Sequence, residues 1–361
     1  MRAERRLPTG SGRECPVGSR RDPWSNAGLR IRRDRGELAV RAPASASDSD
    51  AASLLAWAEN RQVRRVSGLR IALTGASGLA GRAVSAALLR AGHHVRALRH
   101  RAPLPGGLEA SVGALGDAAS HQRLVADRDV LVHLAAIQSG THEELRRINF
   151  DATVALAEAA RAAGLARCVF ISSSSVYAPG SFRDATETHR VGPELPYAIS
   201  KLAAEQALRE RLGGALTVLR PVSLVHSGPC AFFDGLRALV ELELPDVDGS
   251  RTPIDLLHVD DLASAVCAAA SGAGSGGMFH LAGASPPEFR ELAEWTAQPR
   301  GIALRWRACP PAAPAEFPHW LYEAAAVPRT LSIAAARAAL GFDPRADLRA
   351  ALGAALRAGP S

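Results

Sequence analysis

Lysine is almost absent from this sequence. Of its 43 basic residues, 42 are arginine, and the one lysine is Lys201. Cysteine is also rare: the five cysteines are scattered, with no Cys-x-x-Cys pair, which argues against both a zinc site and a disulfide framework. No apolar run is long enough to span a bilayer. These absences predict a cytoplasmic protein with no metal site.

Positive charge is concentrated in the first 68 residues. They hold 14 arginines and 8 acidic residues, a net charge of +6 out of +7 for the whole chain. The segment shows no sustained hydrophobic period and no apolar stretch of an export signal, so we predict that residues 1–68 are a largely disordered, basic extension. A nucleic-acid-binding arm is the sharper interpretation. The segment lacks interleaved aromatic residues, so we favour a solvated tail or sequence upstream of the true start.

A glycine-rich turn follows the first apolar strand. Gly75, Gly78 and Gly81 form a G-x-x-G-x-x-G pattern between a strand at Ile71–Leu73 and a helix at Arg82–Arg90. Glycines in such a turn let backbone N–H groups approach a pyrophosphate, and the helix N-terminus adds a favourable partial charge. The pattern therefore predicts a dinucleotide-binding turn.

Strands and helices then alternate along the chain. Apolar strand runs at Val130–Leu134, Cys168–Ile171 and Leu216–Leu219 are separated by helical patterns at Glu143–Ala163 and Tyr197–Leu212. This alternation predicts an α/β fold with a Rossmann-type, doubly wound parallel sheet. In such sheets ligands bind beyond the carboxyl ends of the strands.

Several short motifs, taken in order, resemble one family. They are TGASGLAG, GD at Gly116–Asp117, HLAA at His133–Ala136, NFDAT, SSSSVY, YAISK, LRP at Leu219–Pro221, HVDDLA at His258–Ala263 and LSIAAARAALGFDP. The chain is similar, over about residues 69–350, to extended short-chain dehydrogenases/reductases of the NAD-dependent epimerase/dehydratase group. The resemblance implies an NAD(P)-binding core at 69–221, to which 257–283 return. It also implies a smaller C-terminal substrate-binding region built from 222–256 and 284–361.

The same resemblance assigns the catalytic roles. Tyr197 is the expected proton carrier, and Lys201 shares its helix face because residues four apart are neighbours. A nearby ammonium would lower the pKa of the phenol, and the planar fork of arginine is a poor substitute for that compact charge. Ser173 is the expected serine that holds the substrate oxygen, with Ser174 as the alternative register and a substrate contact. Asn149 is expected to support a proton path to the lysine.

Cofactor contacts also follow from the resemblance. The expected residues are Gly75, Ser77, Gly78, Leu79, Gly81, Asp117, Ala135, Tyr197 and Lys201, with Asp117 at the adenine. NAD enzymes usually carry an acidic residue after the second strand, whereas arginine suits the 2′-phosphate of NADP. No acidic residue occurs between Gly75 and Leu108. We therefore predict that Arg99 and Arg101 bind NADP, with NAD as the alternative.

Residues that differ from the family's other motifs limit the possible reaction types. Dehydratases of the family carry Thr-Asp-Glu where this chain has Ser173–Ser175, so the carboxylates for elimination are absent and dehydratase chemistry is disfavoured. A reductase, a dehydrogenase or an epimerase remains. Ser223 and His226 replace the Asn and Tyr of many nucleotide-sugar epimerases, which puts a nucleotide-sugar substrate in doubt without excluding it.

The remaining expectations concern substrate and partners. His226 is either a substrate contact or a loop cap, and Arg251 is either a phosphate contact or a solvated arginine. The alternative function is a non-catalytic dinucleotide sensor, which the intact Ser173, Tyr197 and Lys201 set disfavours. The expected partner is a small-molecule substrate, with no membrane and no nucleic acid, and a homodimer is left open.

Overall fold

The chain divides into two compact units, residues 1–68 and 69–361. The structure is a computed structural model that describes residues 6–8, 30–34, 37–41, 68–228, 231–309, 317 and 319–358. In the first unit it describes three antiparallel strands in the order β1-β3-β2. They are β1 (Arg6–Pro8), β2 (Arg30–Asp34) and β3 (Glu37–Arg41). The rest of residues 1–67 lies outside the described residues, so the predicted disorder of the extension stays a prediction.

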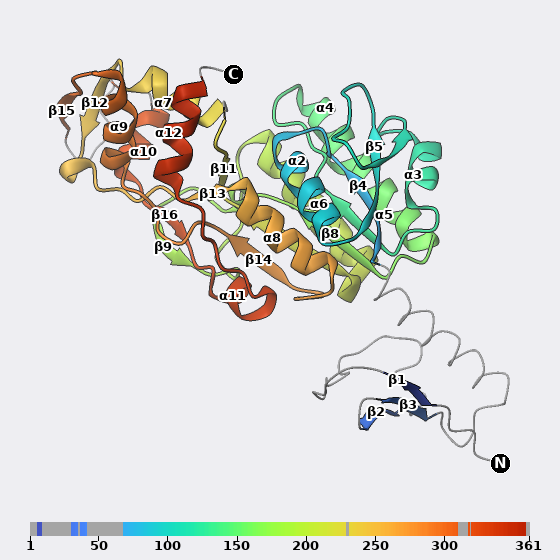
Figure 1. Cartoon of the computed structure of the whole chain (residues 1–361). Coiled ribbons are helices and arrows are strands. Elements are labelled where there is room, and N and C mark those ends of the chain that lie inside the picture. Colours follow the sequence, from blue (N-terminus) through green and yellow to red (C-terminus); the bar gives the residue numbers. More distant parts are fainter. Residues whose placement is uncertain are drawn as a thin grey trace, which may run out of the picture. The chain divides into compact units, whose positions relative to one another are not determined.

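Seven parallel strands form the central sheet of the second unit (Figure 1). Their order is β14-β10-β8-β7-β4-β5-β6, so the chain begins in the middle of the sheet and winds outward in both directions. The strands are β4 (Arg70–Thr74), β5 (His94–Arg99), β6 (Glu109–Val112), β7 (Val130–His133), β8 (Arg167–Ile171), β10 (Leu216–Pro221) and β14 (Met278–Leu281). This order confirms the predicted Rossmann-type, doubly wound sheet.

Alternate residues of each strand pack against helices on opposite faces of the sheet. In β4, Ile71 and Leu73 belong to one apolar cluster, whereas Ala72 belongs to another. The first face is covered by α2 (Leu79–Arg90), α8 (Val259–Ala270) and α11 (Ala334–Leu340). The second face is covered by α3 (Ala118–Val125), α5 (Ala152–Ala162) and α6 (Pro196–Leu212). Burial on both faces explains why the strands read as continuous apolar runs in the sequence.

The helix predicted over residues 143–163 has a break in its regular pattern. It begins as α4 (His142–Leu145), whose N-terminus is closed by a capping box between Thr141 and Glu144. A π-helical turn, η1 (Arg146–Asp151), follows before α5 resumes the regular spacing. Such turns occur frequently at functional sites, because the extra residue re-aims the side chains on the turn.

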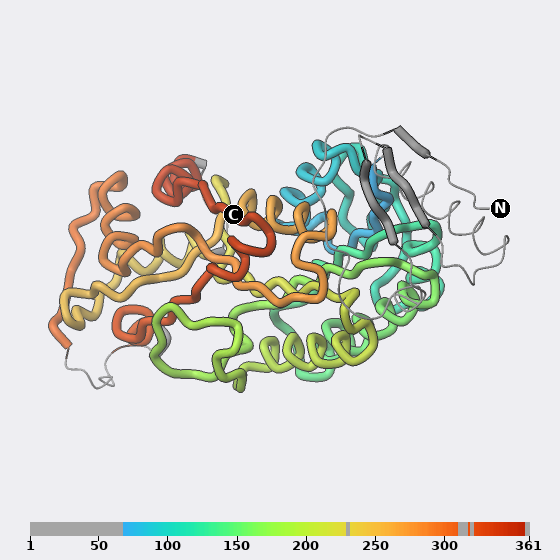
Figure 2. Tube along the Cα trace, turned by 90° about the horizontal axis from the view of Figure 1, so that it is seen from below, coloured from blue at the N-terminus to red at the C-terminus, as the bar shows by residue number. Residues whose placement is uncertain are grey.

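A smaller group of elements lies at one end of the second unit (Figures 1 and 2). Its strands form parallel pairs: β11 (Ser223–Val225) with β13 (Leu256–His258), β12 (Glu243–Asp246) with β15 (Arg305–Ala308), and β9 (Phe182–Ala185) with β16 (Arg329–Leu331). Its helices are α7 (Ala231–Leu239), α9 (Phe289–Ala297), α10 (His319–Ala326) and α12 (Leu348–Ala358). Two apolar clusters of its own, which include Phe233 and Phe289, hold this group together.

Short 3-10 turns complete the second unit. They are η2 (Ser174–Val176), η3 (Gly213–Ala215), η4 (Asp248–Ser250) and η5 (Gln298–Arg300). Across the described parts of the chain, no helix combines the length and the apolar character needed to cross a membrane.

Candidate active site

The three glycines of the turn between β4 and α2 meet three different demands. Gly75 has a φ of +79°, and a Cβ there would lie 2.8 Å from the backbone nitrogen of Ala135. A Cβ on Gly81 would lie 1.9 Å from the carbonyl oxygen of Gly75. Gly78 is exposed, and its nearest neighbour would be that same carbonyl at 3.4 Å. The fold therefore requires glycine at 75 and 81, whereas at 78 the missing side chain leaves open space.

This open space fits the pyrophosphate of a dinucleotide. Gly78 is the N-cap of α2 and brings no side chain to satisfy the first N–H groups of the helix. Helix N-termini of this kind bind phosphate through their free N–H groups and partial positive charge. Ser77 and Leu79 flank Gly78, and Leu79 is 38% exposed although it is apolar. Arg82 in the first turn of α2 donates from Nε to the Ser77 carbonyl at 3.2 Å, which fixes the outer side of the turn.

The end of β5 carries arginine rather than a carboxylate. Arg99 is the last residue of that strand and Arg101 follows two residues later, and both are exposed. Within the described residues neither guanidinium forms an ion pair. Two free cations at this edge of the sheet are compatible with a phosphate ligand.

Asp117 is placed as a helix cap. Its carboxylate accepts hydrogen bonds from the backbone N–H groups of Ala119 and Ser120, at 3.2 and 3.1 Å, and from the Ser120 hydroxyl at 2.5 Å. The Ser120 hydroxyl is the main reason that its pKa is lowered. The predicted contact of Asp117 with adenine stays a prediction.

A chain of buried polar groups links the first strands beneath the turn. The Thr74 hydroxyl lies 2.6 Å from His133 Nδ1, and His133 Nε2 lies 2.8 Å from the Thr153 hydroxyl. The Ala135 backbone N–H donates to the same Thr74 hydroxyl at 3.2 Å. Burial lowers the pKa of His133 to about 3, with a smaller contribution from the charge of Lys201. The imidazole is therefore neutral, and it ties β4 and β7 to α5.

Lys201 is buried under the end of β8. It is 2% exposed, its Nζ donates to the Ile171 carbonyl at 2.6 Å, and it lies 4.2 Å from the centre of the Phe170 ring. Burial lowers its pKa to about 7, and Glu205 opposes that change. The lysine therefore titrates near neutral pH, which is the range where a change of its charge has chemical use.

Ser173 and Tyr197 are brought together at the carboxyl edge of the sheet. Ser173 follows β8 and accepts a hydrogen bond from the Ser175 N–H at 3.1 Å, and its Oγ lies 2.9 Å from Ser175 Oγ. The Ser173 hydroxyl also acts to lower the pKa of Tyr197. Ser174 begins η2, one residue beyond. Tyr197 stands in the first turn of α6, whose N1 position is Pro196, a residue suited to start a helix.

The pKa of Tyr197 is raised in this structure, whereas the sequence predicted that Lys201 would lower it. Burial raises the pKa, and the Ser173 hydroxyl acts against that rise. The physical reason is that the ammonium is directed at the Ile171 carbonyl, while desolvation penalises the phenolate. In this structure Tyr197 is therefore a protonated phenol at neutral pH.

Asn149 holds the loop after β7 rather than the lysine. It lies in the π turn and is 1% exposed. Its Oδ1 accepts from the Ile137 N–H at 2.9 Å, and its Nδ2 donates to the Ile137 carbonyl at 2.8 Å and to the Ser200 hydroxyl at 3.1 Å. The side chain thereby joins this loop to α6 next to Lys201, and its part in a proton path stays a prediction.

Two of the three candidate substrate contacts, His226 and Arg251, lie in the smaller group of elements, whereas Ser174 lies after β8. His226 follows β11, and its Nδ1 accepts a hydrogen bond from the Gly228 N–H at 3.1 Å, as a loop cap does. Arg251 follows η4 and is exposed. Their substrate-binding roles stay predictions.

Sequence reasoning missed the buried ion pair beside the lysine. Glu205, one helical turn after Lys201, pairs with Arg220 on β10. The signal was present in the spacing, because a residue four positions after Lys201 shares its helix face. The partner could not be found in this way, since it lies on another strand.

Comparisons with known proteins point to one family. A profile described as "NAD dependent epimerase/dehydratase family" matches residues 71–282. The chain is 30% identical over 204 residues to a ceramide reductase of Caulobacter vibrioides, a match that covers 55% of this chain and 60% of that protein, less than two thirds of its length. It is 29% identical over 248 residues to a 4-hydroxy-2-methyl-3-oxo-4-farnesyl-3,4-dihydroquinoline-1-oxide ketoreductase of Stigmatella aurantiaca, covering 65% and 74% of the two chains.

A solved structure shows the same likeness at the level of the fold. It is a short-chain dehydrogenase/reductase superfamily protein of Agrobacterium tumefaciens with bound NAD. The TM-score is 0.68 at 25% identity, and the superposition covers 80% of this chain and 96% of that one.

Proposed function

Because the chain belongs to the NAD-dependent epimerase/dehydratase family, we propose that it is an NAD(P)-dependent oxidoreductase acting on a hydroxyl or carbonyl group of a small molecule. The observation that carries the proposal is the buried Lys201, which lies one helical turn after Tyr197 and whose Nζ donates to the Ile171 carbonyl two residues before Ser173, at the sheet edge that also holds the glycine turn. When bound, the nicotinamide cofactor supplies or accepts the hydride.

The roles of the side chains follow from their protonation and contacts. Tyr197 is a protonated phenol at neutral pH because burial raises its pKa, so it can donate a proton to a carbonyl oxygen that gains negative charge. Ser173, which follows β8 at the same edge of the sheet, would hold the same oxygen. Lys201 supplies a titratable cation behind them, and Asn149 keeps the neighbouring loop and helix in register.

Carbonyl reduction is the direction we favour. A protonated phenol is ready to give a proton, whereas oxidation of an alcohol would first require its ionisation. Two of the relatives are named as reductases of carbonyl groups or of ceramide. Epimerisation remains the second candidate because the family includes it, and a nucleotide sugar remains a candidate substrate. The serines at 173–175 keep dehydratase chemistry disfavoured.

NADP is the cofactor we propose, with NAD as the alternative. Arg99 and Arg101 are exposed cations at the end of β5, where an adenosine 2′-phosphate is bound in NADP enzymes of this fold. NADPH should therefore bind the purified chain more tightly than NADH. Replacing both arginines by alanine should remove this difference and leave NADH binding nearly intact. Equal affinities for the two cofactors before mutation would refute the assignment.

The reaction itself is tested with a panel of ketones and UDP-sugars. A reductase consumes NADPH in proportion to product, whereas an epimerase interconverts its sugars with no net consumption. Tyr197→Phe is the matched variant, because it should bind cofactor normally and lose turnover. Tight NADPH binding with no turnover on either substrate class would support the sensor alternative. A cytoplasmic location and a homodimer stay predictions, the second of which light scattering can check.

A further inference from the structure

Helix α6 carries a buried carboxylate one turn beyond its lysine. Glu205 is 4% exposed, and its two oxygens accept hydrogen bonds from Arg220 on β10. Arg220 Nε lies 3.0 Å from Oε1, and Nη2 lies 2.5 Å from Oε2. Both partners are almost fully buried, so this bidentate pair is a fixed part of the interior rather than a surface contact.

Further contacts hold the pair in place from two other elements. Arg220 Nη1 donates to the Tyr177 hydroxyl at 2.8 Å, and that hydroxyl is also hydrogen-bonded to His280 Nε2 on β14. The His280 backbone N–H donates to Glu187 at 3.0 Å. With its guanidinium fixed in this way, Arg220 prevents Glu205 from turning toward Lys201, and the two residues of α6 form no direct ion pair.

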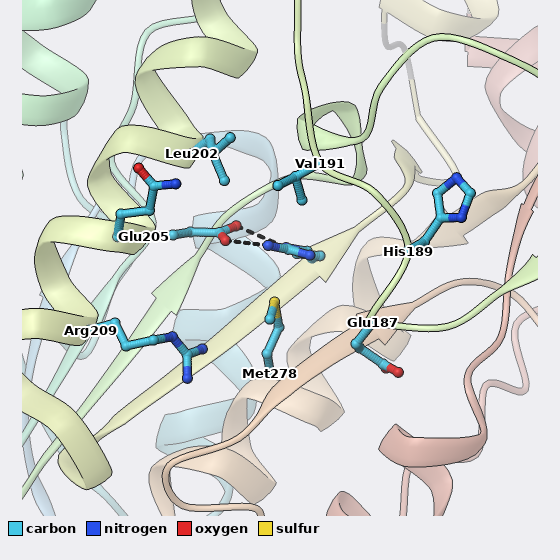
Figure 3. A pocket seen from close by; sticks show the side chains of 9 residues that line it. Glu187, His189, Val191, Leu202, Glu205, Arg209 and Met278 are labelled. Atoms are coloured by element: carbon cyan, nitrogen blue, oxygen red, sulfur yellow. Dashed lines mark hydrogen bonds and ion pairs between the residues drawn. The ribbon is translucent and has the colours of Figure 1, made fainter.

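A pocket of about 260 Å³ borders the pair (Figure 3). Its lining includes Leu202, Val191 and Met278 beside the carboxylate of Glu205. Ser173, Tyr197 and Lys201 are not part of this lining. Glu205 can therefore be changed without removing a group that lines the candidate active site.

The groups that face Lys201 come from three strands and from its own helix. From β8 it meets the Phe170 ring and the Ile171 carbonyl, which carry no charge. From β7 it meets His133, which is neutral because its pKa is about 3. On α6, Tyr197 is a protonated phenol, and Glu205 raises the pKa of the lysine against the effect of burial. Arg220 on β10 pairs with Glu205 and carries the opposite charge.

We propose that Glu205 is a positioning residue for Lys201: fixed by Arg220, its buried carboxylate one helical turn away offsets part of the cost of burying the lysine's charge, so that the ammonium bonded to the Ile171 carbonyl stays populated near neutral pH. Among the groups just named it is the one anion near the lysine. The proposal rests on the proposed function in one respect, namely that the charge of Lys201 is used in catalysis. Its test therefore reads the charge of Lys201 directly and needs no substrate.

The chain offers an unusually clean measurement, because it contains one lysine. Protein grown with ¹³C,¹⁵N-lysine gives a single side-chain NMR signal, whose chemical shift is followed against pH in the full chain. In Glu205→Gln the titration midpoint should move down by about one pH unit, as expected for a charge lost one helical turn away. Glu210→Gln is the matched control, since Glu210 is an exposed glutamate on the same helix, and it should leave the midpoint in place.

A purely structural role of Glu205 predicts that the Lys201 titration midpoint rises rather than falls. If the substitution only loosened α6, water would reach the lysine and its midpoint would rise toward the ordinary value of 10.5. Because Glu205→Gln leaves the Arg220 charge buried and can prevent folding, the double variant Glu205→Gln/Arg220→Gln removes both charges. Its midpoint should also fall. A rise in either variant, or no change beyond that of Glu210→Gln, would overturn the proposal.

Discussion

The glycine turn permits a prediction that separates folding from cofactor binding. In Gly81→Ala the new Cβ would meet backbone atoms, 1.9 Å from the Gly75 oxygen and 2.7 Å from the Ala76 Cα. Backbone cannot move aside as a flexible side chain can, so we expect an overpacking cost of about 1–3 kcal/mol. In Gly75→Ala the φ of +79° alone costs about 1–2 kcal/mol. The 2.8 Å contact with Ala135 adds to that cost.

Gly78→Ala should behave differently. Gly78 has a φ of −74° and a ψ of 173°, which alanine adopts without strain, and its new Cβ would make an ordinary contact at 3.4 Å. Alanine also restricts the unfolded chain, which stabilises the protein by about 0.4–1 kcal/mol at compatible positions. The variant should therefore fold as well as the unmutated protein. The added methyl group would occupy the space at the start of α2 where a pyrophosphate would lie.

Thermal melts without NADPH test the effect of each glycine on folding, and melts with NADPH test its effect on cofactor binding. A change of 1 kcal/mol shifts Tm by about 2–4 °C in a domain of this size class, so Gly81→Ala and Gly75→Ala should melt several degrees lower without cofactor. Gly78→Ala should melt at the same temperature or slightly higher. Saturating NADPH, which at 100 times its Kd adds about 2.7 kcal/mol, should raise the Tm of the unmutated protein and not that of Gly78→Ala. A normal NADPH response in Gly78→Ala would refute the reasoning.

Three further outcomes are expected. Lys201→Arg should lower turnover at least tenfold, about 1.4 kcal/mol of barrier, because the buried site beside the Ile171 carbonyl accommodates one compact ammonium. Tyr197→Phe should lower turnover further while keeping the cofactor affinity. An unchanged turnover of Lys201→Arg would contradict this reasoning. Removing residues 1–66 should leave the melting temperature with NADPH unchanged, whereas a loss of several degrees would show that the extension packs on the body. Burial raises the pKa of Asp255 to about 6, so between about pH 4 and 6 the folded state binds a proton that the unfolded state has lost, and stability falls as pH rises over that range. Asp255→Asn should flatten this dependence in thermal melts recorded at several pH values. An unchanged slope of Tm against pH would argue against a role of Asp255.

The sequence was sufficient for the sheet, and its motifs selected the residues of the candidate site, whose roles stay predictions. Strands buried on both faces read as apolar runs, and the glycine turn has a recognisable spacing, so the parallel sheet was predicted correctly. Tyr197 and Lys201 could be paired because a helix places residues four apart on one face.

Contacts between distant segments were the part that could not be predicted. Thr74 and His133 are 59 residues apart, and nothing in their neighbourhoods indicates that they touch. Asn149 in the π turn bonds to Ile137 and Ser200, which belong to other segments that its local sequence does not indicate. The pKa of Tyr197 was misjudged for the same reason, because its direction depends on how deeply the ring is buried and where the neighbouring ammonium points.

Two buried cations in this structure show why one position kept lysine. Arg220 is 3% exposed and permanently charged. Its burial is tolerated because the Glu205 carboxylate accepts two hydrogen bonds from its planar guanidinium. Lys201 is 2% exposed and has one carbonyl as its nearest acceptor. An arginine there would keep most of its donors unsatisfied in the interior, and it could not release its proton near neutral pH. A lysine is satisfied by fewer partners and titrates at about 7. The chain therefore uses arginine where a carboxylate can pair with the fork, and lysine where the charge must be compact and adjustable.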